Sequence, residues 1–383
     1  MKVRYESFGG IIGLEKPESL IFADKSFMKK MGYLHSDLWD AKQKRLSAPT
    51  EIHFSLTGEC NQNCQHCYMN SGPNKGNEDL SFDEVIAFVD EVAEMSVFHM
   101  ALGGGESLLR SDLFEIAKYI RKKGMVPNLT TNGTIMDENI AKQCNIFGQI
   151  NISLDSLSLS QEQMRDTVDI NTIIKSIELL KKKKNKVGIN SVVNRYNFGE
   201  IENLVQFAKK YKLQDIEFLR LKPQGRGKLV YDKYKCTPEQ HLEFFPLLIK
   251  LSKKYKISLK MDCSYVPMLC AHNPDKKLLE QFYIRGCFGG DMLASVSPSG
   301  DVSPCSFASP SHYKANEFKK AWNQSEIFKK FYTWEEKAPE PCRSCPYLEI
   351  SRGGCHVVTE LVTHDFFAPD PDCPRVVEWR NKK

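Results

Sequence analysis

Short apolar runs and longer amphipathic segments alternate along residues 50–260, and this alternation limits the fold more than any other feature of the sequence. The apolar runs are typical of strands and the segments between them of helices, one of which opens with a serine cap at Ser81. Strands that alternate with helices form a parallel sheet with right-handed crossovers. The six expected strands cover residues 51–56, 99–102, 127–130, 149–154, 187–193 and 215–220. Six tilted strands curl without closing, so we expect an α/β fold, a partial (β/α)6 TIM barrel.

A loop with three cysteines follows the first expected strand. Cys60, Cys64 and Cys67 are separated by three and then two residues. This spacing lets one loop wrap a face of an iron–sulfur cube and leaves one iron without a protein ligand, open to another molecule. The loop also lies at the C-terminal end of a strand, where barrel enzymes place their chemistry. A zinc knuckle is the alternative, but zinc sites usually pair Cys-x2-Cys units in a shell of four ligands.

The loop resembles the cysteine motif of the radical S-adenosylmethionine (radical SAM) superfamily, with Tyr68 as the aromatic residue that follows it. The resemblance implies a 4Fe-4S cluster on Cys60, Cys64 and Cys67 whose open iron is chelated by the amine and carboxylate of SAM. It also implies a reaction, in which an electron from the cluster cleaves SAM to methionine and a 5′-deoxyadenosyl radical that abstracts hydrogen from the substrate. An external donor of the flavodoxin or ferredoxin type is then expected.

Glycine-rich and polar motifs follow the later strands. In Gly103-Gly104-Gly105-Glu106 the glycines let a ligand approach the backbone, and the carboxylate can accept hydrogen bonds from an ammonium group. Ser153 and Arg165 follow in chain order, and these side chains suit a ribose hydroxyl and a carboxylate. Each motif alone is equally typical of a turn or cap. The family resemblance, which extends to a segment at 220–227 that lies near the adenine in some members, implies SAM binding by Tyr68, Gly104, Gly105, Glu106, Asn132, Ser153, Arg165 and Leu221.

A second group of cysteines begins after residue 280, where the strand–helix alternation stops. A short hairpin that turns at Ser299-Gly300 delivers Cys305, and a small hairpin with few apolar residues needs a metal to hold it. The cysteine spacing resembles the SPASM domain, a C-terminal extension of peptide-modifying radical SAM enzymes that binds two auxiliary iron–sulfur clusters. The resemblance assigns the cysteines to a first auxiliary cluster (Cys287, Cys305, Cys355) and a second (Cys342, Cys345, Cys373).

Each auxiliary cluster lacks an assured fourth thiolate. Ser351 stands where the SPASM pattern usually has a cysteine, and it is either a weak oxygen ligand or no ligand. Cys263 or Cys270 is a candidate to complete the first auxiliary cluster, whereas Cys144 and Cys236 are typical of ordinary thiols. A zinc ribbon at the Cys-x2-Cys pair is the alternative, because that spacing alone does not discriminate between metals.

The rest of the chain indicates its boundaries and class. The first 35 residues are expected to form two short strands around a turn and, with a polar linker, an N-terminal β element over residues 1–49. The barrel then covers residues 50–260 and the SPASM-like domain residues 261–383. The sequence shows neither a membrane-spanning run nor a signal peptide, so we expect a cytoplasmic protein that binds no membrane. The lysine run at 181–184 is more typical of a solvated helix end than of a nucleic-acid site.

The leading functional prediction is maturation of a ribosomally synthesised peptide by cross-linking, oxidation or epimerisation, with a leader peptide or a recognition protein as partner. The alternative enzyme modifies tetrapyrrole side chains in haem biosynthesis, because relatives there share endings like Gly353-Gly354-Cys355 and Asp370-Pro371-Asp372-Cys373. A non-catalytic iron–sulfur protein is a third interpretation, but it would not need Gly104, Gly105 and Glu106. The sequence names neither the substrate nor the bond formed.

Overall fold

The computed structural model describes residues 2–15, 18–41, 43, 45–158, 164–165 and 169–382. Its centre is a nine-stranded sheet in the order β10-β9-β8-β7-β6-β5-β4-β11-β12. Neighbouring strands of this sheet run parallel, except β11 with β12. The six strands predicted from the alternation lie side by side in chain order: β4 Glu51–Ser55, β5 His99–Gly103, β6 Val126–Thr131, β7 Ile150–Ser153, β8 Val187–Val193 and β9 Asp215–Arg220.

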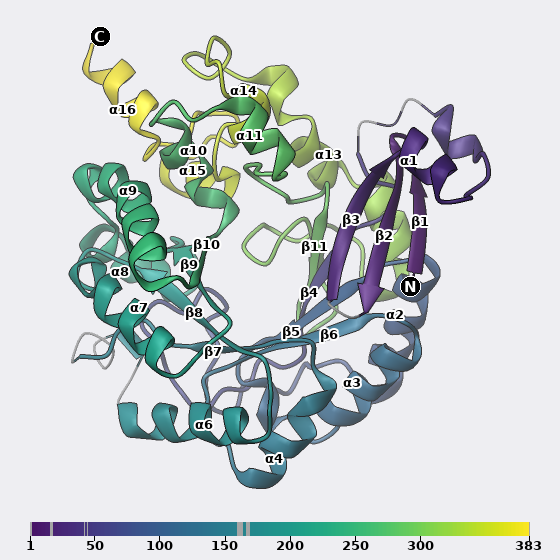
Figure 1. Cartoon of the computed structure of the whole chain (residues 1–383), viewed down its shortest axis with the longest axis vertical. Helices are drawn as coiled ribbons and strands as arrows, with labels where there is room; N and C mark the ends of the chain where they lie inside the picture. Colours follow the sequence, from purple (N-terminus) through teal and green to yellow (C-terminus); the bar gives the residue numbers. More distant parts are fainter. Residues whose placement is uncertain are drawn as a thin grey trace.

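Helices cover the outer face of the curved sheet (Figure 1). Two of them begin with a capping box, α2 at Ser81 and Glu84 and α9 at Thr237 and Gln240, and each box satisfies backbone N–H groups that the first turn of a helix leaves free. The helices of this region are α2 Phe82–Glu94, α3 Leu113–Lys122, α4 Glu138–Gln143, α6 Ile170–Lys182, α7 Ile201–Lys210, α8 Gly227–Tyr234 and α9 Pro238–Tyr255. The α/β partial barrel predicted from the sequence is therefore confirmed.

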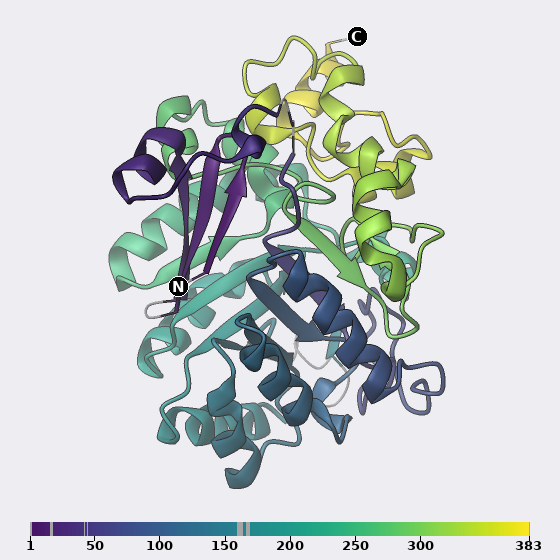
Figure 2. The ribbon, with the colours of Figure 1, turned by 90° about the vertical axis from the view of Figure 1, so that its right-hand side faces the viewer.

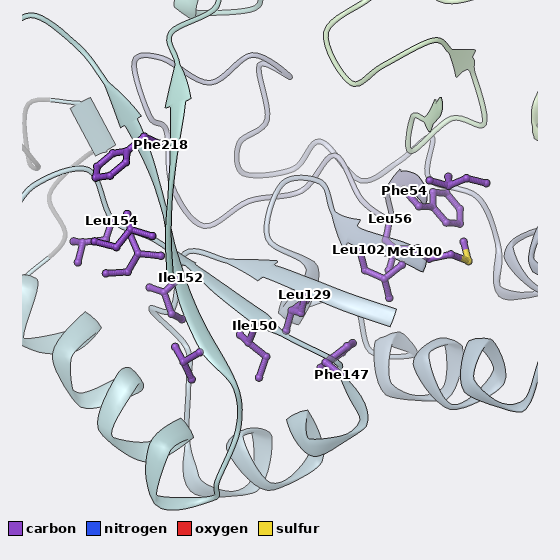
Figure 3. Packing of buried hydrophobic residues seen from close by; sticks show 14 of the residues in the cluster. Phe54, Leu56, Met100, Leu102, Leu129, Phe147, Ile150, Ile152, Leu154 and Phe218 are labelled. Atoms are coloured by element: carbon purple, nitrogen blue, oxygen red, sulfur yellow. The ribbon is translucent and has the colours of Figure 1, made fainter. Parts of the chain in front are cut away.

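The main apolar core lies between the sheet and these helices. Residues at alternate positions of a strand point to the same face, so Ile52 and Phe54 of β4 are buried under the helices while their neighbours face the other side. The same alternation holds in β5 and β7. Figure 3 shows this packing for Phe54, Leu56, Met100, Leu102, Leu129, Phe147, Ile150, Ile152, Leu154 and Phe218.

The sheet extends beyond the six predicted strands at both edges. β10 Ser258–Met261 adds in parallel to β9, and β11 Leu293–Val296 adds in parallel to β4. β11 forms the predicted hairpin with β12 Val302–Ser303, turning at Ser299-Gly300. The hairpin is thus an edge of the barrel sheet. Because Cys305 follows β12, the hairpin brings that thiol to the same region as the loop after β4.

An N-terminal sheet packs against the main body (Figure 2). It has three antiparallel strands, β1 Lys2–Glu6, β2 Gly9–Glu15 and β3 Glu18–Asp24, followed by helix α1 Lys25–Lys30. The prediction of two strands was wrong, because the first run turns before Gly9, whose φ of +147° is readily adopted only by glycine. The buried guanidinium of Arg4 fastens this sheet to the body, since its Nη1 donates to the carbonyl of Pro49 at 2.7 Å.

Most of the C-terminal helices gather at one end of the molecule, at the top of Figure 1, whereas the helix at Phe318–Gln324 packs on α2. They are short, and many residues between them form no regular structure. The helices are α10 Val266–Cys270, α11 Lys276–Gln281, α12 Phe318–Gln324, α13 Glu326–Tyr332, α14 Leu348–Ser351, α15 His356–Thr363 and α16 Pro374–Asn381. No helix in the described part of the chain is long and apolar enough to cross a membrane.

Candidate metal centres and cofactor site

The three-cysteine loop leaves the C-terminal end of β4 and is held by hydrogen bonds from several segments. The carboxylate of Asp79 accepts from the N–H of Gly58 at 2.9 Å and from the hydroxyl of Thr57. The N–H of Cys60 donates to the carbonyl of Gly72 at 3.1 Å. The loop that carries the thiols is therefore fixed by the protein's own groups.

Two glycines after β5 let their turn pack against this loop. A Cβ atom at Gly105 would lie 1.9 Å from the carbonyl oxygen of Glu59, and one at Gly104, where φ is +131°, would lie 2.5 Å from the carbonyl of Thr57. The N–H of Gly105 donates to Thr57 at 2.7 Å, and the N–H of Glu106 donates to Glu59 at 2.8 Å. Backbone packing thus requires these glycines independently of their predicted contact with SAM.

Glu106 lies fully buried between the ends of β5 and β6. One carboxylate oxygen accepts from the hydroxyl of Thr131 at 2.7 Å and the N–H of Leu108 at 3.1 Å, and the other accepts from the N–H of Asn132 at 2.7 Å. The side-chain amide of Asn132 donates to Asn61 in the cysteine loop at 2.9 Å. Burial raises the pKa of Glu106, and these donors oppose the rise. Glu106 therefore positions Asn132 beside the loop, in addition to its predicted contact with the SAM amine.

Replacing Glu106 with Gln is expected to weaken SAM binding about tenfold or more, because removing a charged hydrogen-bond partner costs about 1.5–3 kcal/mol. Calorimetric titration of the anaerobic protein with SAM measures the effect. Thr131→Val is the matched control, since it removes only one of the donors to the carboxylate, and a smaller loss is expected. Unchanged affinity in Glu106→Gln, with normal iron content, would remove Glu106 from the site.

Asp155 was not among the predicted site residues, yet it connects several of them. It accepts two hydrogen bonds from Arg165, at 2.7 and 3.1 Å, and one from the N–H of Val192 at 2.7 Å. Nε2 of His66, in the cysteine loop, lies 3.4 Å from the same carboxylate. The positive charge of Arg165 also acts on Cys64. The sequence signal was the Ser-Leu-Asp turn itself, in which only the serine was singled out.

Ser153 and Leu221 lie on strand ends near this network. Ser153 is half-buried as the last residue of β7. Leu221 directly follows β9 and is buried in a small apolar cluster with Met164 and Tyr231. The predicted SAM contacts of both residues remain predictions.

The segment after β9 closes over the cysteine loop. Nε of Arg226 donates to the carbonyl of Cys64 at 2.8 Å, and its N–H donates to the carbonyl of Cys67 at 3.0 Å. Gly225 has a φ of +55°, and a Cβ atom there would lie 2.4 Å from the carbonyl of Tyr68. The contacts of this segment are with the backbone of the loop, and its place near the adenine of SAM, which the resemblance implies, remains a prediction.

The thiols of Cys60, Cys64 and Cys67 lie near enough for their charges to interact. Burial raises the pKa of Cys64 to about 11, and repulsion from the thiolates of Cys67 and Cys60 adds to the rise. Three thiolates held this closely need positive charge among them, and an iron–sulfur cluster supplies it. In the described chain, no three His, Cys, Asp or Glu side chains are arranged to hold a single metal ion. Three cysteine thiolates from one loop are the donor set that an iron–sulfur cluster takes.

A second set of thiols joins Cys287, Cys305 and Cys355 with Cys263. The thiolates of Cys287 and Cys355 raise the pKa of Cys263, after burial, and those of Cys355 and Cys263 act in the same way on Cys305. Cys263 opens the segment after β10, the strand that the sequence did not predict. Of the two candidates for a fourth ligand of the first auxiliary cluster, the fold thus brings Cys263 to the site.

Cys342, Cys345 and Cys373, which the SPASM resemblance assigns to the second auxiliary cluster, lie within electrostatic range of one another. After burial, the charges of Cys373 and Cys345 raise the pKa of Cys342 to about 12. The N–H of Cys345 donates to the carbonyl of Cys342 at 3.0 Å. Cys144 and Cys236 are both buried in the main apolar core, as expected of ordinary thiols.

Tyr68 lies between the cysteine loop and the first auxiliary set. Its phenol is hydrogen-bonded to Ser55 of β4 and to Ser306, the residue after Cys305, and its ring meets that of Phe307 edge to face at 4.7 Å. Burial raises the pKa of Tyr68 to about 12, so the phenol stays neutral. The aromatic residue of the predicted motif therefore joins the two groups of thiols.

A buried ion pair joins the barrel to both auxiliary sets. Arg220, at the end of β9, donates to both carboxylate oxygens of Asp370 at 2.7 and 2.9 Å and to Asp372 at 2.7 Å. Asp370 in turn accepts from the N–H of Cys355 at 2.9 Å, and its carbonyl accepts from the N–H of Cys373 at 3.1 Å. The spacing of the Asp-Pro-Asp-Cys motif is thus explained by its contacts, because both aspartates bind Arg220 and Asp370 also binds the backbone of one cysteine of each set.

The concave side of the curled sheet, here called the lumen, is the side away from the helices, and it carries polar side chains. The imidazole of His53 lies 3.1 Å from the carboxylate of Glu51 and 3.0 Å from the hydroxyl of Ser306. The side chain of His53 is 39% exposed and that of Glu51 is 37% exposed. Burial, with repulsion from Asp262 and Glu51, raises the pKa of Glu217 to about 7. Since Glu217 belongs to β9 and Glu51 to β4, the curl brings distant strands of the sheet within electrostatic range.

Two family models match the chain. Residues 54–208 match the radical SAM superfamily, a range that includes the cysteine loop, the glycine turn and the Ser-Leu-Asp turn. Residues 287–346 match SPASM, described as an iron–sulfur cluster-binding domain. Both resemblances predicted from the motifs are confirmed.

Curated relatives and solved structures match over most of their length. The AdoMet-dependent heme synthase of Methanosarcina barkeri is 28% identical over 342 residues, covering 85% of this chain and 97% of that protein. The mycofactocin maturase of Mycolicibacterium smegmatis is 26% identical over 341 residues, covering 86% of this chain and 84% of that protein. The crystal structure of Streptococcus suis SuiB bound to the precursor peptide SuiA has the same fold, with a TM-score of 0.77 and 17% identity over 97% of this chain and 98% of that one.

Proposed function

The chain belongs to the radical SAM superfamily and has a C-terminal SPASM domain, and from this premise we propose that it modifies a ribosomally synthesised peptide by cross-linking, oxidation or epimerisation. The main observation in support of this reaction class is that the cysteine loop contacts the ends of β5 and β6, with hydrogen bonds from the N–H groups of Gly105 and Glu106. The substrate class is supported by the mycofactocin maturase, which matches across 84% of its length.

Bound at the cysteine loop, the 4Fe-4S cluster and SAM supply a 5′-deoxyadenosyl radical that abstracts a hydrogen atom from the substrate. The protein's part is to bind, orient and shield. Cys60, Cys64 and Cys67 would hold the cluster, and the turn with Glu106 would hold the amine of SAM. Arg226 keeps the loop closed through the carbonyls of Cys64 and Cys67.

The charge of the lumen favours a peptide over a tetrapyrrole. Tetrapyrroles carry several carboxylates, which need unpaired cations. Glu51 and Glu217 face the lumen. Two lysines nearby are paired with aspartates, Lys260 with Asp215 at 2.6 Å and Lys222 with Asp262 at 3.1 Å. A neutral or basic peptide segment fits such a lumen without uncompensated repulsion.

Tetrapyrrole side-chain modification is retained as the second candidate because the heme synthase matches across 97% of its length. The Gly353-Gly354-Cys355 motif, which haem-pathway relatives share, does not decide between the two candidate functions, because packing also explains its two glycines. A Cβ atom at Gly353 would lie 2.2 Å from the ring of Trp334, and one at Gly354 would lie 2.5 Å from the carboxylate of Asp370.

Anaerobic turnover separates the two candidates. The reconstituted enzyme, with SAM and dithionite, is offered either a candidate precursor peptide found by a search of its gene neighbourhood or iron coproporphyrin, and the product is analysed by mass spectrometry. We expect 5′-deoxyadenosine formation to rise, and a mass change to occur, only with the peptide. A mass change only in the tetrapyrrole would overturn the proposal. Glu217→Gln, which keeps the shape of the lumen, is expected to lower peptide turnover without altering the cluster.

The remaining partners complete the proposal. A leader segment of the peptide or a separate recognition protein would bring the substrate to the enzyme, and a flavodoxin or ferredoxin would reduce the cluster. A reducing, cytoplasmic setting is consistent with the thirteen cysteines, all of which are free thiols.

A further inference from the structure

The second auxiliary set has the three thiols that the SPASM resemblance implies, and another thiol, Cys270, lies in an apolar cluster that includes one of them, Cys345. We propose that Cys270 is the fourth ligand of the second auxiliary cluster, with Cys342, Cys345 and Cys373, and that Ser351 is not a ligand. The inference rests on the auxiliary clusters of the proposed function but not on its substrate. It departs from the sequence prediction, in which Cys270 was a candidate only for the first cluster.

Packing places Cys270 beside Cys345. Cys270 ends helix α10 and is 1% exposed. It belongs to a small apolar cluster that also contains Tyr347, Ile350 and, at its edge, Cys345. Helix α10 packs directly on α14, the helix that follows the Cys-x2-Cys pair. A buried thiol at this contact thus faces the segment that carries two of the three other ligands.

Hydrogen bonds fasten the end of α10 to both ligand-bearing segments. Nη2 of Arg375, two residues after Cys373, donates to the carbonyl of Cys270 at 3.1 Å and to the side chain of Asn273 at 2.5 Å. The hydroxyl of Tyr347, two residues after Cys345, donates to the carbonyl of Pro274 at 2.8 Å. Residues 270–274 are therefore fixed relative to both segments, as a ligand bridging them must be.

Charge interactions agree with this placement. The cysteines whose charges act on Cys270 are Cys345 and Cys373. Those that act on Cys263 are Cys287 and Cys355. The two cysteines thus belong to different sets, and each auxiliary set has four thiols.

Ser351 is held in place by its backbone. Its carbonyl oxygen would lie 2.0 Å from a Cβ atom at Gly286, and it accepts from the N–H of Gly354 at 3.0 Å. The N–H of Gly286 donates to the carbonyl of the preceding residue, Ile350, at 2.6 Å. The backbone of Ser351 thus packs on the segment that leads into Cys287. A serine oxygen is also a harder donor than iron–sulfur clusters prefer, so with Cys270 in place no ligand is needed at position 351.

The test uses the full-length chain in which Cys60, Cys64 and Cys67 are alanine, so that only auxiliary iron is counted. Anaerobically reconstituted protein of this background should hold about eight irons if both auxiliary clusters are cubes. Adding Cys270→Ala should either remove one iron per chain and leave the sulfide unchanged, with the EPR signal of a three-iron cluster, or remove four irons and four sulfides with the loss of one cluster signal. Adding Ser351→Ala or Ser351→Cys should change neither the iron content nor the spectrum.

Cys144→Ala is the matched control, because it truncates another fully buried thiol that belongs to none of the three sets. It should keep the iron content of the background. The proposal is overturned if Cys270→Ala retains all iron and its spectrum, if Ser351→Ala loses a cluster instead, or if the unmodified site holds zinc without sulfide. Failure to modify a peptide would leave these readouts unchanged, so the two proposals fail separately.

Discussion

Replacing Cys60, Cys64 and Cys67 together with alanine is expected to abolish SAM cleavage while leaving the auxiliary iron in place. Each auxiliary set has its own cysteines on segments other than the three-cysteine loop. A cluster cannot be retained without its thiolates. Formation of 5′-deoxyadenosine under anaerobic reducing conditions, measured by chromatography, should fall below detection.

Iron analysis of the same protein is the necessary control. The triple variant should lose about four irons and keep the auxiliary share. Cys236→Ala offers a matched single substitution, because this buried thiol is packed in the apolar core away from the loop. If the triple variant still forms 5′-deoxyadenosine, the loop is not the site of SAM cleavage and the proposed function is wrong.

Arg220→Met is expected to have the largest effect on stability. The guanidinium is 3% exposed and lies between two carboxylates, and Asp370 is fully buried. Methionine fills a similar volume but leaves these carboxylates without a cation, and breaking a buried ion pair from one side costs about 3–5 kcal/mol. The melting temperature, measured anaerobically by circular dichroism, should fall by roughly five degrees.

The same substitution should release auxiliary iron to a chelator faster, because Asp370 positions the backbones of Cys355 and Cys373. Arg380→Met, on the exposed face of α16, is the control, and its melting temperature should equal that of the wild type. An unchanged melting temperature and chelation rate in Arg220→Met would show that the ion pair neither stabilises the C-terminal domain nor holds its ligands.

Local signals in the sequence were enough for the barrel and for the cysteine loop. The period of apolar residues places Ile52 and Phe54 on one face of a strand whatever surrounds it, and Ser81 caps α2 through a residue three positions away. The three thiols of the loop are close in sequence, so a short chain must keep them close in space. Predictions of this kind depend on a few neighbouring residues, and they were confirmed for the fold.

The partners of isolated residues depended on the tertiary structure. Spacing cannot pair Cys270 with Cys345 or Cys263 with Cys287, because long segments separate them and only the packing of α10 on α14 and the unpredicted strand β10 bring them together. From the sequence, Asp155 is likewise typical of a turn, and only the structure shows that Arg165 and His66 both contact its carboxylate. The sequence by itself determined the strands, the loop and the kind of ligand, while the curl and packing of the sheet decided which side chains meet, since contacts between distant residues exist only after the chain has folded.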